Sequence, residues 1–178
     1  ARFDCLKWSA VPRRGTKNLL LLEDLGVGSS GRVWLTCDSS GRVAVIKFCI
    51  KPEQELKDIT RKEFLEKELK RWKQIYPELG EKCRVQKFAG HWALLMPRLA
   101  PLERNAESIQ LVEQTLQTSF ADAGLTHRDV AWRNIGYYVT SAGEKKAVVF
   151  DMESVRESKS SDWIEDALEH LRGRGAPE

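Results

Sequence analysis

The stretch Leu125-Thr126-His127-Arg128-Asp129-Val130-Ala131-Trp132-Arg133-Asn134 carries the most informative pattern in this chain. It lies between a predicted helix and a predicted strand, and we expect a polar loop over His127–Asn134. Asp129 and Asn134 stand five residues apart, where a tight loop can bring a carboxylate and an amide oxygen together. A carboxylate can accept the proton of a hydroxyl group, and an amide oxygen can bind Mg²⁺. The loop is therefore a candidate site for chemistry.

A second carboxylate follows the strand predicted downstream of this loop. The apolar run Ala147–Phe150 ends in Asp151, seventeen residues after Asn134. A carboxylate at the end of a strand beside the loop is well placed to supply a second metal ligand. Asn134 and Asp151 are thus the candidate metal ligands.

Far upstream, Lys47 interrupts the apolar strand Val43-Ala44-Val45-Ile46-Lys47-Phe48. A buried cation is costly unless an anion pairs with it. Strand alternation predicts that Val45 and Lys47 share one face and that Ile46 lies on the other. Lys47 therefore needs a carboxylate partner from a neighbouring element.

The helix predicted after this strand offers Glu63, Glu66 and Glu68. Glu68 lies next to the apolar stripe of the helix, which favours it as the partner of Lys47. Glu66 is the alternative, although it is nearer to the solvent side. All three could instead belong to a solvated face, because this segment is highly charged.

Three glycines, Gly26, Gly28 and Gly31, precede the lysine strand. The residues after them are strand-like, which favours a glycine hairpin over the strand-to-helix turn of a dinucleotide fold. In such a hairpin, backbone N–H groups can close over phosphate oxygens because no side chain blocks them. The spacing alone is also compatible with an ordinary flexible turn.

The predicted elements change in character near residue 100. The first part has five strands and one helix in the order β-β-β-α-β-β, and the second part has two helices and a small hairpin. We expect an α+β fold with lobes at 1–100 and 101–178, a five-stranded antiparallel sheet in the first and mainly helices in the second. The first lobe comprises Leu19–Leu25, Arg32–Cys37, Arg42–Ile50, the helix Glu53–Tyr76, Val85–Phe88 and Trp92–Met96. The second comprises the helix Ser108–Ala123 with Gly124 as its C-terminal cap, Ile135–Val139, Ala147–Phe150 and the helix Asp162–Leu171.

Taken in order, these motifs resemble the signature set of eukaryotic-type protein kinases. The pattern spans the glycine hairpin, Lys47, a helix glutamate, His127-Arg128-Asp129 with Asn134, and Asp151, over roughly residues 20 to 155. Other sequence stretches, such as Leu94-Leu95-Met96-Pro97-Arg98-Leu99, resemble those of small kinase-like domains of fungi and oomycetes. These include the kinase-type C-terminal domains of Crinkler effectors. The resemblance implies a minimal two-lobed kinase-like fold.

The resemblance also implies a site for ATP between the lobes. Gly26, Gly28 and Gly31 would cover the phosphates, and Lys47 would hold the α- and β-phosphates while paired with Glu68. Adenine would pack on Val33 and Val45, and the backbone of the hinge from Met96 to Leu99 would read its edge. ATP is the implied nucleotide.

In the second lobe, the resemblance assigns the chemistry to the polar loop. Asp129 would orient or deprotonate the acceptor hydroxyl, and Asn134 and Asp151 would hold Mg²⁺. A typical kinase has a lysine two residues after the catalytic aspartate, whereas this chain has Ala131 there. Arg133 could take over that task.

Two further departures concern the end of the chain. Asp151-Met152-Glu153 stands where Asp-Phe-Gly is usual, and only 27 residues follow Asp151. We therefore expect this chain to lack the substrate-binding helices of a full kinase. Ala176-Pro177-Glu178 matches a kinase motif, and we interpret it as coincidence.

The composition restricts the classes of partner and compartment. The 178 residues include 29 basic and 26 acidic side chains, for a net charge of +3, which favours neither nucleic acid nor membrane as a partner. Cys5, Cys37, Cys49 and Cys83 are scattered and are expected to be reduced. With no signal or lipidation motif, we expect an intracellular protein of the cytoplasm or nucleus, or of a host cell if it is an effector.

Three functions remain open from the sequence. The first is an ATP- and Mg²⁺-dependent protein serine/threonine kinase, which acts on an unidentified protein or on itself. The second is a nucleotide-binding pseudokinase that serves as an interaction module, which Ala131 and the short second lobe favour. The third is a small-molecule kinase, although that branch often has His-Gly-Asp in place of His127-Arg128-Asp129.

Overall fold

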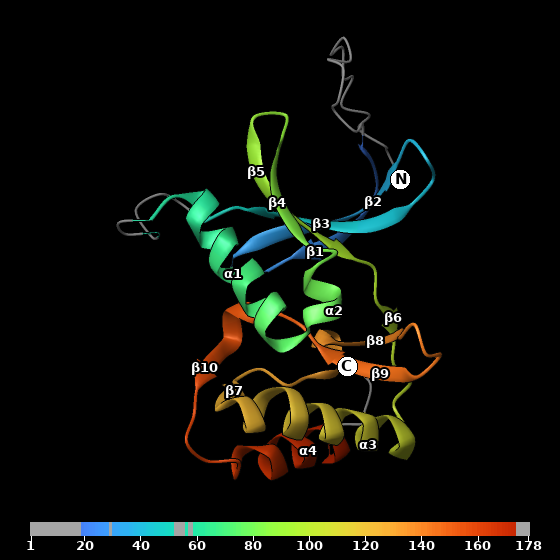
Figure 1. Cartoon of the computed structure of the whole chain (residues 1–178), viewed down its shortest axis with the longest axis vertical. Coiled ribbons are helices and arrows are strands. Elements are labelled where there is room, and N and C mark those ends of the chain that lie inside the picture. Colours follow the sequence, from blue (N-terminus) through green and yellow to red (C-terminus); the bar gives the residue numbers. More distant parts are fainter. Residues whose placement is uncertain (1–18, 29, 52–55, 57–58, 174–178) are drawn as a thin grey trace.

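The structure is a computed structural model that describes residues 19–28, 30–51, 56 and 59–173. A five-stranded antiparallel sheet forms one half of the molecule, and helices with two smaller sheets form the other (Figure 1). The expected α+β class and the five-stranded antiparallel sheet are confirmed. The sheet contains β1 Leu19–Val27, β2 Gly31–Asp38, β3 Val43–Cys49, β4 Arg84–Phe88 and β5 His91–Pro97, in the order β1-β2-β3-β5-β4.

The two faces of this sheet have different neighbours. On β3, Ile46 is fully buried in a small outer cluster with Ala93 and Leu95. The adjacent Lys47 belongs to the inner face, which α1 (Arg61–Ile75) covers. The alternation predicted for β3 is therefore confirmed, and it directs the lysine toward the middle of the molecule.

Helix α1 begins later than the sequence analysis predicted. Thr60 caps it, since the Thr60 hydroxyl accepts from the N–H of Glu63 and the Glu63 carboxylate accepts from the N–H of Thr60. This capping box satisfies two backbone donors at the helix start, so Ile59 and Thr60 stay outside the helix. Of the predicted range 53–60, residues 53–55 and 57–58 lie outside the described residues. A short helix, α2 (Pro77–Gly80), follows and was not predicted.

The second half departs further from the predicted elements. The single helix expected over 108–123 is instead α3 (Ala106–Thr115), a π-helical turn η2 (Leu116–Phe120) and a 3-10 turn η3 (Ala121–Ala123). Gly124 ends it in the left-handed conformation, with a φ of 67°, as expected for a C-terminal cap. The last helix is α4 (Trp163–Gly173).

Two small sheets frame the polar loop. The predicted hairpin is present as β8 (Ile135–Val139) and β9 (Lys145–Val149), and β6 (Ala100–Pro101) adds a third strand to it. Only the first residue of the expected loop His127–Asn134 lies in a strand: β7 (Leu125–His127) pairs with β10 (Val155–Glu157). The loop itself includes the 3-10 turn η4 (Trp132–Asn134), and η5 (Met152–Ser154) precedes β10.

One hydrophobic cluster joins the two halves. It includes Trp72 of α1, Phe120 of η2 and Val149 of β9. Tyr76, just after α1, donates its hydroxyl proton to the carbonyl of Val149 at 3.2 Å and accepts from the Val149 N–H at 2.9 Å. Burial raises the pKa of the Tyr76 hydroxyl, which stays protonated. The division into lobes near residue 100 stays a prediction, because this core is shared.

Other expectations concern cysteines and membrane spans. Cys37, Cys49 and Cys83 are free thiols, as expected, and Cys5 lies outside the described residues. Within the part of the chain that the structure describes, no helix combines the length and the apolar character needed to cross a bilayer.

Candidate functional site

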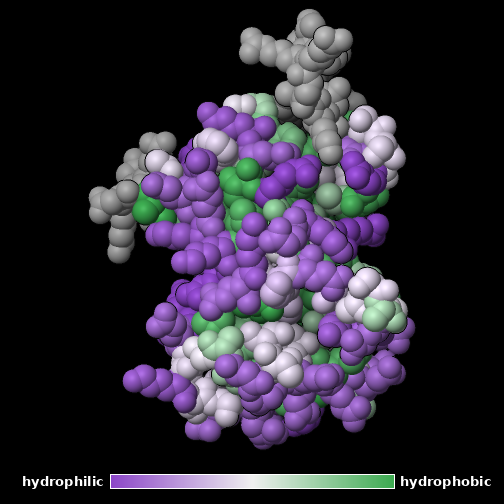
Figure 2. Space-filling view, viewed as in Figure 1, coloured by the Kyte–Doolittle hydropathy of each residue, from purple (hydrophilic) through white to green (hydrophobic). Residues whose placement is uncertain are grey.

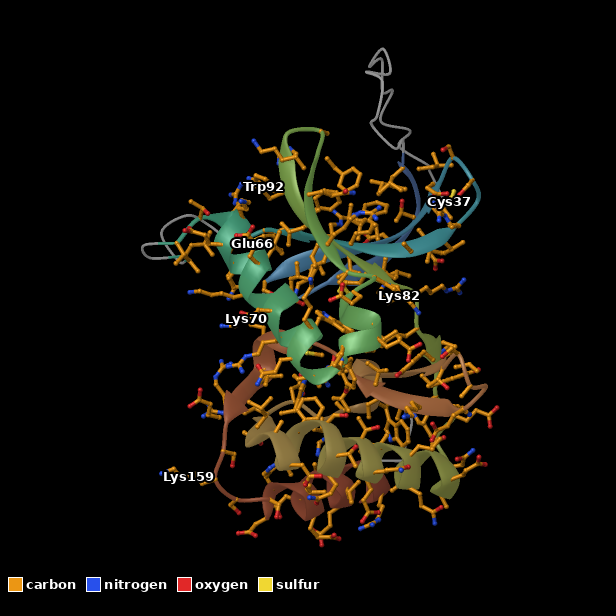
Figure 3. All side chains as sticks on the ribbon, viewed as in Figure 1. Cys37, Glu66, Lys70, Lys82, Trp92 and Lys159 are labelled. Carbon is orange, nitrogen blue, oxygen red and sulfur yellow. The ribbon has the colours of Figure 1, made fainter. Side chains whose placement is uncertain are left out.

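Lys47 and Glu68 form the buried half of the candidate site. The Nζ atom of Lys47 lies 2.8 Å from Oε2 of Glu68, and the two side chains are only 8% and 6% exposed. The pairing expected for Glu68 is therefore present. The alternative, Glu66, pairs instead with Lys62 on the exposed side of α1, where Figure 3 labels it. That outer surface over α1 and α2 is mostly hydrophilic (Figure 2).

Around this pair, carboxylates outnumber ammonium groups. Burial lowers the pKa of Lys47, but Glu68, Asp151 and Glu153 together outweigh it and raise that pKa above its usual value of 10.5. Burial raises the pKa of the Glu68 carboxyl, and Lys47 offsets only part of this effect. The two shifts have different causes: three carboxylates raise the pKa of Lys47, whereas burial is the main cause of the raised pKa of Glu68. Carboxylates therefore outnumber ammonium groups among the charges that act on Lys47.

Gly31 lies directly against the Lys47 side chain. A Cβ atom built on Gly31 would come within 2.8 Å of Cε of Lys47 and 2.8 Å of the carbonyl oxygen of Phe48. Only glycine therefore allows the glycine hairpin to lie on the lysine stem. Gly26 has a φ of 127°, which favours glycine, and a Cβ on it would meet nothing. Gly28 closes the hairpin, with its N–H bonded to the carbonyl of Gly31 at 2.9 Å.

The other predicted nucleotide-binding residues fall on the inner face of the sheet. Val33 is paired directly with Lys47, and Val45 with Met96, so these four side chains point to the same side. At the end of the hinge, Leu99 packs against Gly136 of β8, where an added Cβ would lie 2.9 Å from Cβ of Leu99. An apolar surface therefore extends from β2 to the hinge. Four residues of β1 with exposed apolar side chains add to the apolar surface of the sheet: Leu20, Leu22, Leu25 and Val27.

The exposed half of the site is the polar loop. Nη2 of Arg133 lies 2.7 and 2.8 Å from the two carboxylate oxygens of Asp129. Nδ2 of Asn134 donates to the Asp129 carbonyl at 3.0 Å and to its Oδ2 at 2.8 Å. Arg133 thus lies on the Asp129 carboxylate, and its task toward the transferred phosphoryl group stays a prediction. Both of these hydrogen bonds use the side-chain nitrogen of Asn134 and not its side-chain oxygen.

His127 ties this loop to the segment that carries Asp151. Its Nδ1 accepts from the N–H of Asp129 at 3.2 Å, so the proton is on Nε2, which donates to the carbonyl of Phe150 at 2.9 Å. The N–H of Phe150 in turn donates to the carbonyl of Asn134 at 2.9 Å. Burial lowers the pKa of His127, in keeping with a neutral ring. The sequence analysis assigned His127 no separate role. Its hydrogen bond to the carbonyl of Phe150 could not be predicted from the residues next to it in the sequence.

Asp151 has a backbone conformation that is uncommon for a residue with a side chain. Its φ and ψ are 69° and 62°, in the left-handed region. Such a conformation costs roughly 1–2 kcal/mol, although aspartate tolerates it better than most residues. Non-glycine residues in strained conformations cluster at functional sites. The Asp151 Oδ2 accepts from the hydroxyl of Ser154 at 3.0 Å.

No three His, Cys, Asp or Glu side chains gather in a metal-binding group among the described residues. A cation at Asn134 and Asp151 would therefore need oxygen atoms from another source, such as phosphate. A separate cavity of about 220 Å³ lies elsewhere, between the end of α1, α3 and β9. Its lining includes Tyr76, Tyr138 and Lys146 but none of the predicted site residues.

Sequence reasoning missed two side chains beside the site, Lys51 and Glu153, which form an ion pair across 102 residues of sequence. Lys51 belongs to no recognisable spacing, and Glu153 was noted only as the residue in place of the last glycine of Asp-Phe-Gly; the fold brings the two together.

Comparison with known proteins identifies the family of this chain but says nothing about any reaction that it catalyses or any ligands that it binds. No curated protein matches the chain. Residues 24–138 match a family described only as of unknown function, DUF5898, and this range includes the glycine hairpin, Lys47, Glu68 and the polar loop. Asp151 and Glu153 lie beyond the matched range. Because the match covers well over half of the 178 residues, the chain belongs to the DUF5898 family.

Proposed function

We propose that this protein is a minimal ATP- and Mg²⁺-dependent phosphotransferase with a kinase-like fold. Its substrates would be serine or threonine residues of proteins. The observation that carries the proposal is the buried Lys47–Glu68 pair beneath Gly31, with Asp151 close enough to raise the pKa of Lys47. A buried lysine beside a glycine hairpin suits the phosphates of a nucleotide. The proposal gives each of the site residues one task.

The adenine ring would bind to the apolar side of the site. Val33, Val45 and Met96 share the inner face of the sheet, and Leu99 follows in the hinge. This surface is partly exposed, and an apolar surface left open on a small protein often marks a binding site. The hinge backbone would read the polar edge of the ring.

Mg²⁺ fits the oxygen ligands that Asn134 and Asp151 offer at the phosphate end of the proposed nucleotide site. The ion usually binds one or two protein oxygens and completes its shell with water and substrate phosphates. The Asn134 amide donates only through its nitrogen, which leaves the oxygen for a cation. Asp151 keeps Oδ1 free of side-chain hydrogen bonds among the described residues. When bound, Mg²⁺ would neutralise phosphate charge between these two side chains.

Asp129 would act on the acceptor hydroxyl, by orienting it and accepting its proton. Arg133 lies on the Asp129 carboxylate and would stabilise the charge of the transferring phosphoryl group, in place of the absent lysine. The acceptor would be a serine or threonine of another protein or of this chain. Action within a host cell, as an effector, is part of the same proposal.

One observation favours a second candidate function, a nucleotide-binding pseudokinase that acts as an interaction module. Arg133 engages both carboxylate oxygens of Asp129, and Asn134 engages one of them again. In that arrangement Asp129 has little capacity left for a substrate hydroxyl. The pair is exposed, however, and an exposed ion pair opens at a cost of about 1 kcal/mol or less.

Transfer of labelled phosphate from ATP, measured beside ATP affinity, separates the two functions. We expect Asp129→Asn to lower transfer to a mixed protein substrate or to the protein itself by roughly 100-fold or more. ATP affinity should stay within a few-fold, because Asp129 acts on the acceptor. Asp166→Asn, on the exposed side of α4, is the matched control and should transfer normally.

Equal transfer in the wild type and in Asp129→Asn, with ATP bound by both, would point to a contaminating kinase and support the pseudokinase. Absence of ATP binding in the wild type would overturn the proposed nucleotide site itself.

A further inference from the structure

Ser154 joins the segment that carries Asp151 to the polar loop. It is the last residue of η5, directly before β10 (Figure 1). Its N–H donates to the carbonyl of Asp151 at 2.9 Å, and its own carbonyl accepts from the N–H of Arg128 at 3.1 Å. Arg128 immediately precedes Asp129 in the polar loop. These two bonds fix the backbone of Ser154, so its hydroxyl group is attached at a fixed point between Asp151 and the loop.

The Ser154 hydroxyl donates to the carboxylate of Asp151. The distance from Oγ of Ser154 to Oδ2 of Asp151 is 3.0 Å, and no other hydrogen bond to this carboxylate occurs among the described residues. A carboxylate that caps a helical turn accepts from a backbone N–H. Asp151 stands at the N-terminal cap position of η5 but makes no such side-chain bond. The contact is therefore not a helix cap, and what it fixes is the orientation of the carboxylate.

A neutral hydrogen-bond donor distinguishes Asp151 from the other carboxylates of the site. A hydroxyl group holds a carboxylate without neutralising its charge, so the negative charge of Asp151 stays available to a cation. Within the part of the chain that the structure describes, the other three carboxylates each have an ammonium or guanidinium partner: Glu68 with Lys47, Glu153 with Lys51, and Asp129 with Arg133.

We propose that Ser154 is a positioning residue for Mg²⁺, whose hydroxyl holds Oδ2 of Asp151 so that Oδ1 is presented to the ion. This role rests on the proposed function and adds the residue that orients the metal ligand of that site. Carboxylates that bind metals are themselves held by outer hydrogen bonds, and loss of such a partner lowers metal affinity by roughly 10- to 100-fold. The bond also restrains the Asp151 side chain before the ion arrives, which lowers the entropy lost on binding.

The ATP affinity of the full chain, measured by calorimetry in excess Mg²⁺ and again in EDTA, tests this role. Ser154→Ala removes the hydroxyl but keeps both backbone bonds, so we expect it to fold. Its ATP affinity in Mg²⁺ should fall by roughly tenfold, because Asp151 is no longer oriented. Its ATP affinity in EDTA should be unchanged, since Ser154 acts only through the metal ligand. Ser154→Thr keeps a hydroxyl group and should restore most of the affinity in Mg²⁺.

Ser158→Ala is the matched control. It removes a hydroxyl that donates to the carbonyl of Ser160 at 2.9 Å and to no predicted site residue. This variant should bind ATP as the wild type does, both in Mg²⁺ and in EDTA. Unchanged ATP affinity of Ser154→Ala in Mg²⁺ would overturn the positioning role. An equal loss in Mg²⁺ and in EDTA, or an equal loss in Ser154→Thr, would also overturn it, because either result would make the effect of Ser154 purely structural.

The wild type separates failure of this role from failure of the proposed function. If it binds ATP and Mg²⁺ strengthens the binding, the proposed site stands whatever the Ser154 variants do. If it binds no ATP, or binds ATP equally well in EDTA, the proposed nucleotide or metal site fails, and the role of Ser154 fails with it.

Discussion

The two ion pairs of the candidate site differ in how much water reaches them. The Lys47 and Glu68 side chains are 8% and 6% exposed, whereas those of Arg133 and Asp129 are 71% and 39% exposed. A buried pair cannot open without leaving a charge in a low-dielectric interior, but an exposed pair exchanges partners cheaply. The comparison therefore separates a fixed, structural half of the site from a half that is free to act on a substrate.

The largest effect is expected where the buried pair is broken. Lys47→Met leaves Glu68 buried beside Asp151 and Glu153, and should lower the free energy of unfolding by about 3–5 kcal/mol. The double variant Lys47→Met/Glu68→Leu replaces both charges with apolar groups and should recover most of that loss. Urea unfolding followed by circular dichroism measures both.

The exposed neighbour on the same helix provides the control for this comparison. Glu66→Gln removes an exposed carboxylate and should change stability by about 0.5 kcal/mol or less. If the double variant were no more stable than Lys47→Met, the loss would come from packing and not from the stranded charge.

An intermediate effect is expected at His127, which joins the two halves of the site. Burial lowers the pKa of His127 in the folded protein below its usual value of 6.5. The unfolded chain therefore takes up a proton first as the pH falls. Full stability is present above about pH 6.5 and should be lost, by at most about 1.4 kcal/mol per pH unit, as the pH falls toward the folded-state pKa.

Unfolding measured between pH 5 and 8 checks this sign. His127→Gln should flatten the slope over that interval, while His91→Gln and His170→Gln, both exposed, should leave it unchanged. A slope that persists in His127→Gln would assign the pH dependence to another group.

The smallest effect on stability is expected at the exposed pair. Arg133→Ala should change the free energy of unfolding by about 1 kcal/mol or less, as should Arg172→Ala, which breaks an exposed pair with Glu165. Only Arg133→Ala should lower the rate of phosphate transfer, with little change in ATP affinity, because its contact with the phosphoryl group grows in the transition state. A large loss of stability in Arg133→Ala would instead make Arg133 an anchor of the loop.

Much of the sheet was predictable, because strand patterns act over short distances. Alternation alone placed Ile46 and Lys47 on opposite faces, and the apolar stripe of α1 favoured Glu68 over Glu66. The start of α1 was predicted wrongly, although Thr60 and Glu63 have the spacing of a capping box. That signal was present and should have outweighed the helical composition of the preceding residues.

Other parts of the site had no local signal. The bond from His127 to Phe150 joins residues 23 apart, and the Glu153–Lys51 pair joins residues 102 apart. The short strands β7 and β10 form only because they meet each other, since three residues carry too little pattern to be predicted. These contacts depend on which elements pack together.

The sequence by itself determined the local pieces: the strands of the five-stranded sheet, the glycine hairpin, and the polar loop with Asp129 and Asn134. These follow from side-chain period, glycine conformation and residue spacing, which are properties of neighbouring residues. Only the tertiary structure decided that Gly31 must lie on Lys47, that Arg133 pairs with Asp129, and that Glu153 pairs with Lys51. The physical reason is that burial and charge pairing depend on the distance between groups in space, which the order of residues along the chain does not specify.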